Sequence, residues 1–367
     1  MSRRRAPRRR PHNPVIQHFV NVSGGKDSTA VYLLALRRGR PFRAIMADTG
    51  HEHPATLDYV EQLPDRSGGP RVELVRADFS AEIARKRRHV ETAWRTDGVP
   101  EATVERALAA LVPTGIPMLD LCLWKGRFPS RRAQFCTEFL KQRAVHDACV
   151  GPALRQGPVV QWLGVRRDES RNRALAPFTQ RVRQKGCHDM LLFRPLIHWT
   201  AANVFALIRA HGLEPNPLYL QGMGRVGCFP CIHAGKDELA AIGRRFPWAI
   251  DRLLEYEAAV MAASKRGIAT FFAADKTPEG AALARRLKRR ALAETRRAHP
   301  DLDPASRDFA RAQQKRLSAL CSDATWPRAD SVFRWATTAR GGRQYGLLQW
   351  NGEDEGLSFS SQYGLCE

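Results

Sequence analysis

Seven consecutive residues near the start of the chain have the composition of a phosphate-binding loop. Two glycines let backbone N–H groups turn toward an anion without obstruction by a Cβ atom, and a helix beginning here would add positive charge at its N-terminus. One lysine supplies a point charge, and three hydroxyl groups supply hydrogen bonds. The spacing of a Walker P-loop, GxxxxGKS or GxxxxGKT, is absent. The sequence therefore predicts a different type of phosphate site, formed by Ser23, Gly24, Gly25, Lys26, Asp27, Ser28 and Thr29.

Two further polar segments each follow an apolar run that predicts a strand. The first extends from Asp48 and Thr49 to Pro54. Read alone, it is either an ordinary polar turn before a Pro-started helix or part of a binding site. The second carries arginine, whose planar guanidinium can bind an oxyanion through two hydrogen bonds, although a surface cluster of paired charges would look the same. This second segment contains Gly164, Arg166, Asp168, Glu169 and Ser170.

Cys228 and Cys231 form a CxxC pair. Such a pair can be a redox dithiol, half of a zinc site or part of an iron–sulfur cluster. A redox dithiol usually opens a helix in a thioredoxin-like unit, and a four-thiolate zinc site would want a second CxxC pair, which the chain lacks. A cluster is therefore favoured, with zinc and free thiols as alternatives. Incidental thiols are expected at Cys122, Cys149 and Cys321, and structural histidines at His51, His53, His188 and His233.

The elements that must position these residues alternate along the chain. Apolar, β-branched runs predict strands, and apolar residues at helical spacing between them predict helices, as in the βαβ units of a parallel sheet. The first two polar loops should then face one crevice at the carboxyl edge of the sheet. The predicted strands are 15–22, 42–47, 71–76, 159–164 and 191–195, and the predicted helices are 27–38, 54–63, 79–88 and 201–210. Later in the chain, 240–266 and 280–297 predict helices with long basic faces.

The charge balance favours a polyanionic partner. The 367 residues include 59 Lys and Arg against 37 Asp and Glu, a formal net charge of +22. This excess excludes an acidic solvating protein and favours nucleic acid or nucleotide phosphates as partners. The basic stretches Arg285–Arg297 and Arg85–Arg88 and the arginine-rich N-terminal arm could follow a DNA or RNA backbone, or they could be solvated surface.

The remaining composition indicates a soluble, two-domain protein. Apolar residues make up 43% and charged residues 26%, which allows a packed core. No apolar run reaches the roughly 18 residues of a membrane helix, and no apolar stretch follows the six arginines of residues 1–10, so we expect neither a membrane partner nor a secretory signal. A reducing, cytoplasmic location follows from this expectation. The expected organisation is a disordered basic arm (1–13), a nucleotide-binding α/β domain (14–235), a basic helical region (236–324) and a tail (325–367).

The motifs together resemble one protein family. Ser23–Thr29 resembles the SGGxDS loop of the ATP-pyrophosphatase (PP-loop) superfamily. Asp48–Pro54, followed by Thr56, resembles the DTGxExPxT segment of its 3′-phosphoadenylyl-sulfate (PAPS) reductase branch, and Gly164–Arg171 resembles the GIRxDES segment of that branch. Residues 135–141, with a Cys-Thr pair before a Leu-Lys pair, are also similar to it. The resemblance covers roughly residues 14–260.

This resemblance implies a fold, ligands and roles. The fold would be a Rossmann-like parallel sheet of the adenine nucleotide alpha hydrolase type with a helical C-terminal extension. The ligand would be ATP or a related adenine nucleotide, with Mg²⁺ near Asp48. Arg166 would contact phosphate or sulfate oxygens. Reaction chemistry would involve Lys26, Asp27, Asp48 and Arg166, and nucleotide binding would involve the Ser23–Thr29 loop, Asp48, Thr49, Gly164, Arg166, Asp168, Glu169 and Ser170.

The resemblance also implies an iron–sulfur cluster. Cys136, Cys228 and Cys231 correspond in order to segments that carry the cysteines of a 4Fe–4S cluster in adenylyl-sulfate reductases and related thiolation enzymes. The chain departs from those reductases at Phe135-Cys136, where they carry adjacent cysteines. A fourth ligand would be Cys366 or Cys187, or would be absent and leave an open iron.

The reaction is predicted by comparing the motifs of this chain with those of reductases of activated sulfate. Reductases of activated sulfate have usually lost the full SGGKDS loop, which is intact here, and they use a C-terminal Glu-Cys-Gly-x-His motif, which is absent. An ATP-dependent enzyme that adenylates a nucleic acid for sulfur transfer is therefore favoured, served by a sulfur-donor protein. The alternatives are a reductase of adenylyl or phosphoadenylyl sulfate, and a nucleotide-gated nucleic-acid-binding subunit without turnover. The oligomeric state is left open.

Overall fold

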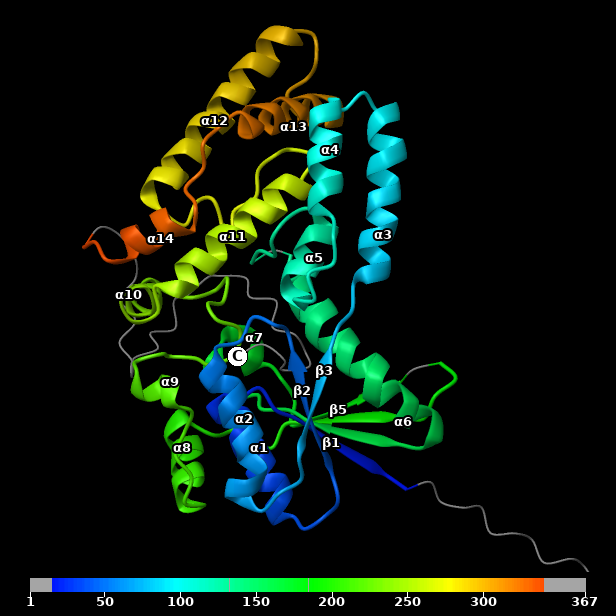
Figure 1. Cartoon of the computed structure of the whole chain (residues 1–367), viewed down its shortest axis with the longest axis vertical. Helices are drawn as coiled ribbons and strands as arrows, with labels where there is room; N and C mark the ends of the chain where they lie inside the picture. Colours follow the sequence, from blue (N-terminus) through cyan, green and yellow to red (C-terminus); the bar gives the residue numbers. More distant parts are fainter. Residues whose placement is uncertain (1–14, 132, 184, 340–367) are drawn as a thin grey trace, which may run out of the picture.

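A six-stranded sheet organises the half of the molecule that is drawn lowest in Figure 1. The computed structural model describes residues 15–131, 133–183 and 185–339. The strand order is β3-β2-β1-β4-β6-β5, and β5 alone in this sheet is antiparallel to its neighbour. The predicted α/β class with a mainly parallel sheet is confirmed. The strands are β1 (Gln17–Asn21), β2 (Arg43–Asp48), β3 (Val72–Arg76), β4 (Val159–Trp162), β5 (Thr179–Val182) and β6 (Met190–Phe193).

Helices cover both faces of the sheet because successive residues of a buried strand point to opposite faces. On one face, Val20 of β1 packs with α1 (Lys26–Arg37) and α8 (Ala201–Ala210). On the other, the neighbouring Phe19 packs with residues 145–154, which include a π-helix (His146–Val150) and α6 (Gly151–Gln156). The central strand is thus buried on both sides.

The strand order places a crevice beside β1. From β1 the chain builds β2 and β3 on one side, and it then crosses to β4 on the other side of β1. Ligands of open α/β sheets bind at such a reversal point, outside the carboxyl ends of the strands. The Ser23–Thr29 loop leaves β1 here, and the Gly164–Ser170 segment follows β4.

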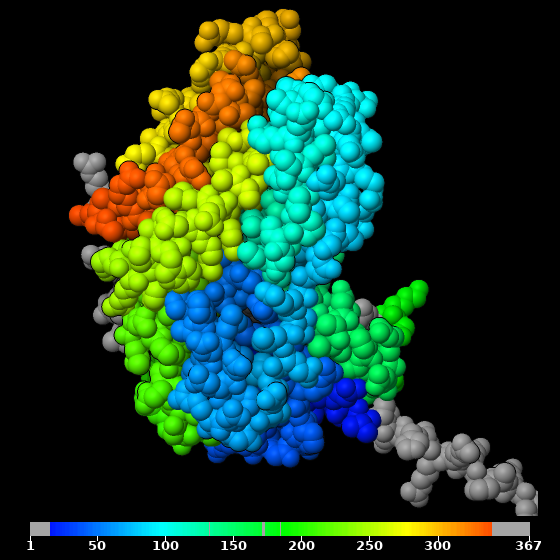
Figure 2. All heavy atoms as spheres, in the orientation of Figure 1, coloured from blue at the N-terminus to red at the C-terminus, as the bar shows by residue number. Residues whose placement is uncertain are grey.

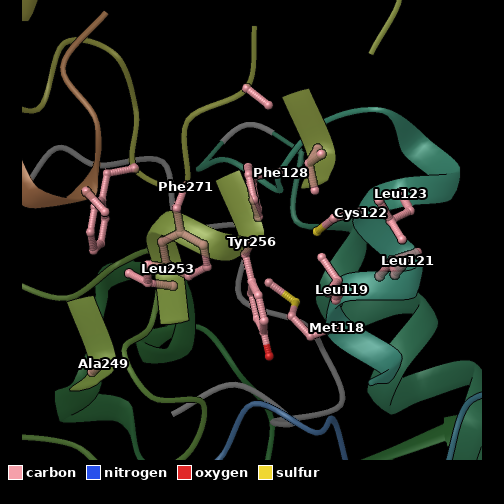
Figure 3. Packing of buried hydrophobic residues seen from close by; sticks show 14 of the residues in the cluster. Met118, Leu119, Leu121, Cys122, Leu123, Phe128, Ala249, Leu253, Tyr256 and Phe271 are labelled. Atoms are coloured by element: carbon pink, nitrogen blue, oxygen red, sulfur yellow. The ribbon is translucent and has the colours of Figure 1, made fainter. Parts of the chain in front are cut away.

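A helical region with its own core lies above the carboxyl edge of the sheet (Figure 1). Figure 3 shows Met118, Leu119 and Cys122 of one helix facing Leu253 and Tyr256 of another. The helices of this region are α3 (Ser80–His89), α4 (Glu101–Ala110), α5 (Pro117–Lys125), α10 (Lys236–Arg245), α11 (Trp248–Ala263) and α14 (Ala329–Ala336).

Some predicted boundaries are wrong. Residues 240–266 form α10 and α11 rather than one helix, because Pro247 lies between them and cannot donate a backbone N–H. The predicted tail contains the helix α14. The basic helix predicted at 280–297 is present as α12 (Pro278–Ala298), and it packs against α13 (Arg307–Ser322). The arm 1–13 lies outside the described residues.

The remaining helices are α2 (Pro54–Ser67), α7 (Arg171–Ala174), α9 (Pro217–Leu220), the π-helices Val90–Trp94 and Thr137–Arg143, and the 3₁₀ turn Arg167–Glu169.

Among the described residues, no helix is both long enough and apolar enough to span a bilayer.

Candidate functional site

The loop after β1 is closed by its own hydrogen bonds. Gly24 has a φ of +76°, a left-handed conformation that favours glycine, and a Cβ atom there would also lie 2.6 Å from Thr56 Cγ2. The backbone N–H of Ser23 donates to Ser28 Oγ over 3.0 Å, and the Ser28 hydroxyl donates to the Gly25 carbonyl oxygen over 3.0 Å. Gly25 is the N-cap of α1, so the loop opens onto the positive end of a helix.

Asp27 holds two cations at the base of this loop. Its carboxylate is fully buried and accepts a hydrogen bond from Nε of Arg166, while its Oδ2 lies 3.0 Å from Nζ of Lys26. Arg166 also binds Asp168, and its backbone N–H donates to Oε2 of Glu169 over 2.8 Å. Burial by itself would lower the pKa of Arg166, but the three carboxylates raise it overall, so the guanidinium stays charged.

The loops after β1 and β4 touch through their backbones at Gly164. A Cβ atom on Gly164 would lie 2.9 Å from the carbonyl carbon of Asp27 and 3.0 Å from the backbone nitrogen of Ser28. Only a residue without a side chain lets the two loops approach this closely. The glycine predicted to contact a nucleotide therefore also sets the spacing of the site.

The loop after β2 positions the CxxC segment. Glu52 is buried, and it accepts hydrogen bonds from the backbone N–H and hydroxyl of Thr49 and from the backbone N–H of His51. A β-bridge joins Glu52 to Cys228, and the Phe229 N–H donates to the His51 carbonyl oxygen over 2.6 Å. The polar turn of the sequence is thus a structural junction between the sheet and the cysteines.

Asp48, which the resemblance places near Mg²⁺, makes two contacts within the protein. Its Oδ1 accepts a hydrogen bond from the Gly50 N–H, and its Oδ2 lies 2.9 Å from Nε of Arg76 on β3. Asp48 lines neither of the two cavities described below.

A small cavity lies at the carboxyl edge of the sheet. We call it the sheet-edge cavity. Three of the residues predicted from the sequence line it, namely Ser23, Ser28 and Gly164, and the charged side chains that line it belong to Glu52 and Lys141. Its apolar end is formed by Val22, Ile45, Met46, Ala47 and Val145. The cavity thus places a polar loop beside an apolar wall.

A second small cavity adjoins the first and shares the lining residues Ser23, Lys141 and Gly227 with it. Cys136, Cys228 and Cys231 all line this cysteine cavity, so the structure brings the three predicted thiols to one space. Within the described chain, however, no three His, Cys, Asp or Glu side chains are arranged as metal ligands. Cys366 lies outside the described residues, whereas Cys187 packs elsewhere, against the core beneath α6.

The cysteine cavity is electrostatically positive. His51 is buried, and burial followed by the nearby Arg252 lowers its pKa to about 3, so its neutral ring contacts the Pro230 carbonyl oxygen through Nε2. Burial, then Arg225, Arg131 and Lys276, lowers the pKa of His233 to about 4. The hydrogen bond of His51 to Pro230 fits the structural role that we predicted for this histidine.

Sequence reasoning missed four residues that support the site. Lys141 lines both cavities. Asn21 lines the sheet-edge cavity, and its buried amide nitrogen has no hydrogen-bond partner among the described residues. Asn216 donates to the Gly24 carbonyl oxygen over 3.2 Å, and Tyr219 Oη accepts the Lys26 backbone N–H over 2.9 Å. The Leu-Lys pair at Lys141 was the one usable sequence signal. The others act across long sequence separations that no local pattern records.

Comparison with known proteins gives the family. The model of the phosphoadenosine phosphosulfate reductase domain matches residues 17–234, more than half of the chain. The chain therefore belongs to this family, within the PP-loop ATP-pyrophosphatase superfamily, as the motifs predicted.

The chain is also similar to individual proteins. A protein of Escherichia phage 186, described as an uncharacterized 37.8 kDa protein in the gpa 5′ region, is 40% identical over 362 residues, covering 95% of this chain and 96% of the phage protein. An adenosine 5′-phosphosulfate reductase of Mesorhizobium japonicum is 26% identical over 219 residues, covering 59% of this chain and 67% of that reductase. A crystal structure of Candida auris PAPS reductase in complex with phosphate aligns with a TM-score of 0.35 at 16% identity, covering 59% of this chain and 82% of that one.

The approach at Gly164 yields a stability prediction. Gly164→Ala should destabilise the fold by about 1–3 kcal/mol, because the added methyl group meets backbone that cannot rotate away. Gly224→Ala is the matched control, because an added Cβ there would have no heavy atom of the described chain within 4 Å, and it should stay within about 0.5 kcal/mol of the wild type. Chemical denaturation measures both. Equal stabilities of the two variants would contradict the close packing of the loops.

The buried charges yield a second prediction. Asp27→Asn should cost about 3–5 kcal/mol of folding free energy, because Arg166, which also pairs with Asp168, would lose its fully buried carboxylate partner. Asp308→Asn removes the same charge from an exposed pair with Arg311, and we expect no measurable change there. Thermal and urea unfolding of the two variants provide the comparison. An Asp27→Asn protein as stable as the wild type would show that the carboxylate does not hold the two loops together.

Proposed function

We propose that this protein is an ATP-dependent enzyme that adenylates a nucleic-acid acceptor and prepares it for sulfur transfer. The observation that carries the proposal is the complete Ser23–Thr29 loop at the edge of a cavity that adjoins a second cavity lined by three cysteines. Nucleotide chemistry and sulfur chemistry could then occur in neighbouring spaces, with Lys141 facing both.

In the proposed reaction an acceptor oxygen attacks the α-phosphorus of ATP and gives up its proton to water. The bond between the α-phosphorus and the bridging oxygen breaks, and pyrophosphate leaves with the electron pair. A sulfide-level nucleophile from a sulfur-donor protein then attacks the acceptor carbon or phosphorus that bears the adenylated oxygen. A bond from that atom to sulfur forms, its bond to the oxygen breaks, and AMP leaves with the oxygen and the electron pair. The loop N–H groups, the α1 N-terminus and Lys26 would stabilise the charge that develops on pyrophosphate, which is the main task of proteins in phosphoryl chemistry.

Magnesium would enter with the nucleotide. Among the described residues that line the sheet-edge cavity, Glu52 alone has a carboxylate, and both its oxygens already accept hydrogen bonds. Mg²⁺ commonly keeps several waters and binds substrate phosphates with few protein ligands, which fits such a cavity. Asp48 would have to release Arg76 before it could act as a ligand.

The cysteine cavity has the donor set of an iron–sulfur site. Its three thiols come from two separate segments, and Arg225 lines the same cavity. Cys136, Cys228 and Cys231 would hold the cluster after a local rearrangement, with Cys366 as a possible fourth ligand. When bound, a cluster with one iron open to solvent can carry sulfide.

A reductase of adenylyl or phosphoadenylyl sulfate is the second candidate, because several relatives carry the name adenosine 5′-phosphosulfate reductase. The two functions differ in their products. The proposed enzyme releases pyrophosphate from ATP, whereas a reductase releases sulfite from the activated sulfate when a reduced thiol protein is supplied. A nucleotide-gated binding subunit would release neither.

The phosphate loop leads to a binding prediction. Lys26→Ala should weaken ATP binding by about 1.5–3 kcal/mol, the usual contribution of a charged hydrogen bond. Titration calorimetry with the wild type, Lys26→Ala and the exposed control Lys265→Ala measures this loss, and the control should bind as the wild type does. A wild type without affinity for ATP, or a Lys26→Ala protein with unchanged affinity, would defeat the nucleotide assignment.

The shared thiol cavity leads to a metal prediction. Anaerobically purified protein should contain iron and inorganic sulfide and be brown, and substitution of Cys136, Cys228 or Cys231 by Ser should each disturb the same visible spectrum. Cys122→Ser and Cys149→Ser are the controls, because both thiols are buried in apolar cores and neither lines the cavity. Cys366→Ser asks whether a fourth protein ligand exists.

Two results would contradict the cluster. One is stoichiometric zinc without iron. The other is a Cys136→Ser protein with an unchanged spectrum, which would confine the metal to the CxxC pair.

A further inference from the structure

Two helices outside the family domain form a separate basic unit. α12 and α13 pack against each other beyond residue 234, where the family match ends, and they project from the end of the molecule opposite the sheet (Figures 1 and 2). A small core centred on Leu287, Ala291 and Leu320 joins them. Only this narrow face of α12 is buried, so most of the helix surface is available to a partner.

The charge of this unit is one-sided. Its two helices carry eleven Lys and Arg against Glu279, Glu294 and Asp308. Glu294 pairs with Arg290 and Arg316, and Asp308 pairs with Arg311. Eight exposed cations form no ion pair within the described chain: Arg285, Arg286, Lys288, Arg289, Arg296, Arg297, Arg307 and Lys315.

A groove between the helices contains a polar site. Thr295 is 2% exposed, lines the groove and has a buried hydroxyl without a hydrogen-bond partner among the described residues. Arg297 and Lys315 line the same groove, as do Glu294 and Arg316, which pair with each other. A hydroxyl and cations that line one groove can together bind a phosphate oxygen.

The other basic run of the sequence is occupied by internal contacts. Arg87 on α3 donates to the carbonyl oxygens of Leu108 and Leu111, and Arg85 pairs with Glu82. The Nζ of Lys86 lies 5.2 Å from the centre of the Trp94 ring. Three of the four side chains of Arg85–Arg88 thus have internal contacts, and the arginine-rich arm lies outside the described residues, so the α12–α13 unit is the stretch that best fits the expected phosphate track.

The side chains exposed on α12 and α13 indicate which polyanion the unit binds. A membrane-binding helix needs exposed apolar side chains, and single-strand binding relies on exposed aromatic rings. None of the large apolar side chains exposed in the described structure lies on α12 or α13. The B-DNA major groove admits an α-helix, whereas the deep, narrow major groove of A-form RNA does not. Duplex DNA is the polyanion that fits a projecting, arginine-rich helix.

We propose that the α12–α13 unit binds the backbone of duplex DNA, with one phosphate held by Thr295, Arg297 and Lys315. This inference deepens the proposed function by naming the class of acceptor. Binding itself needs no nucleotide chemistry, so the two proposals can fail separately.

The test is fluorescence anisotropy of the full chain with a duplex of about 20 base pairs, roughly two helical turns, without ATP. The log of the affinity should fall linearly with the log of salt concentration between about 50 and 200 mM. Arg297→Ala/Lys315→Ala should reduce that slope by roughly 0.9, the contribution of the one phosphate that both side chains hold. The charge-matched control Arg181→Ala/Arg183→Ala, at the end of β5, should keep the wild-type slope.

The variant Thr295→Val distinguishes a specific phosphate contact at Thr295 from general electrostatic attraction between DNA and the basic helices. Loss of one hydrogen bond to a charged phosphate should weaken binding about 10–100-fold at every salt concentration, with the slope unchanged. The proposal is overturned if the wild type does not bind duplex DNA at low salt, if both double variants have equal slopes, or if Thr295→Val binds as the wild type does. Equal or tighter binding of single-stranded DNA, duplex RNA or anionic vesicles would also overturn it. DNA binding without pyrophosphate release would refute the proposed reaction alone.

Discussion

The site depends on a buried carboxylate between two cations. Asp27 lies in the first turn of α1, and its ion pair with Arg166 ties the loop after β1 to the loop after β4, two segments that are 139 residues apart. Removing charges from water is costly unless each is paired and hydrogen-bonded, so this triad with Lys26 constrains both loops at once. The missing side chain of Gly164 lets the backbones meet, and every other feature of the sheet-edge cavity is built around that contact.

The same geometry places the phosphate loop next to the cysteines. The turn after β2 fixes the CxxC segment through backbone contacts of His51 and Glu52, so the cysteines are held against the same edge of the sheet as the phosphate loop. The two cavities share Ser23, Lys141 and Gly227. A substrate atom activated in one space would need to move little to meet a sulfur atom in the other, which is why the proposed reaction couples adenylation to sulfur transfer.

Local patterns predicted what local physics determines. The strand–glycine–helix unit at Ser23–Thr29 was predictable because β-branched residues, a turn and helical spacing follow one another. The strand β5 was missed because its sequence TQRV is short, polar and half-exposed at a sheet edge. The role of Asn216 was also missed, because its bond to the Gly24 carbonyl oxygen joins residues 192 positions apart. Asp48 fitted a magnesium ligand by motif alone, whereas the register of β2 against β3 pairs it with Arg76.

The central claim is that the Ser23–Thr29 loop and the sheet-edge cavity bind an adenine nucleotide through its phosphates. A crystal structure of the full chain with α,β-methylene-ATP, which resists cleavage at the proposed bond, tests this most directly. The account predicts β- and γ-phosphates within hydrogen-bond distance of the backbone N–H groups of the loop, and the base at the apolar end near Ile45 and Val145. A nucleotide bound elsewhere, or an empty cavity at saturating nucleotide, would contradict it.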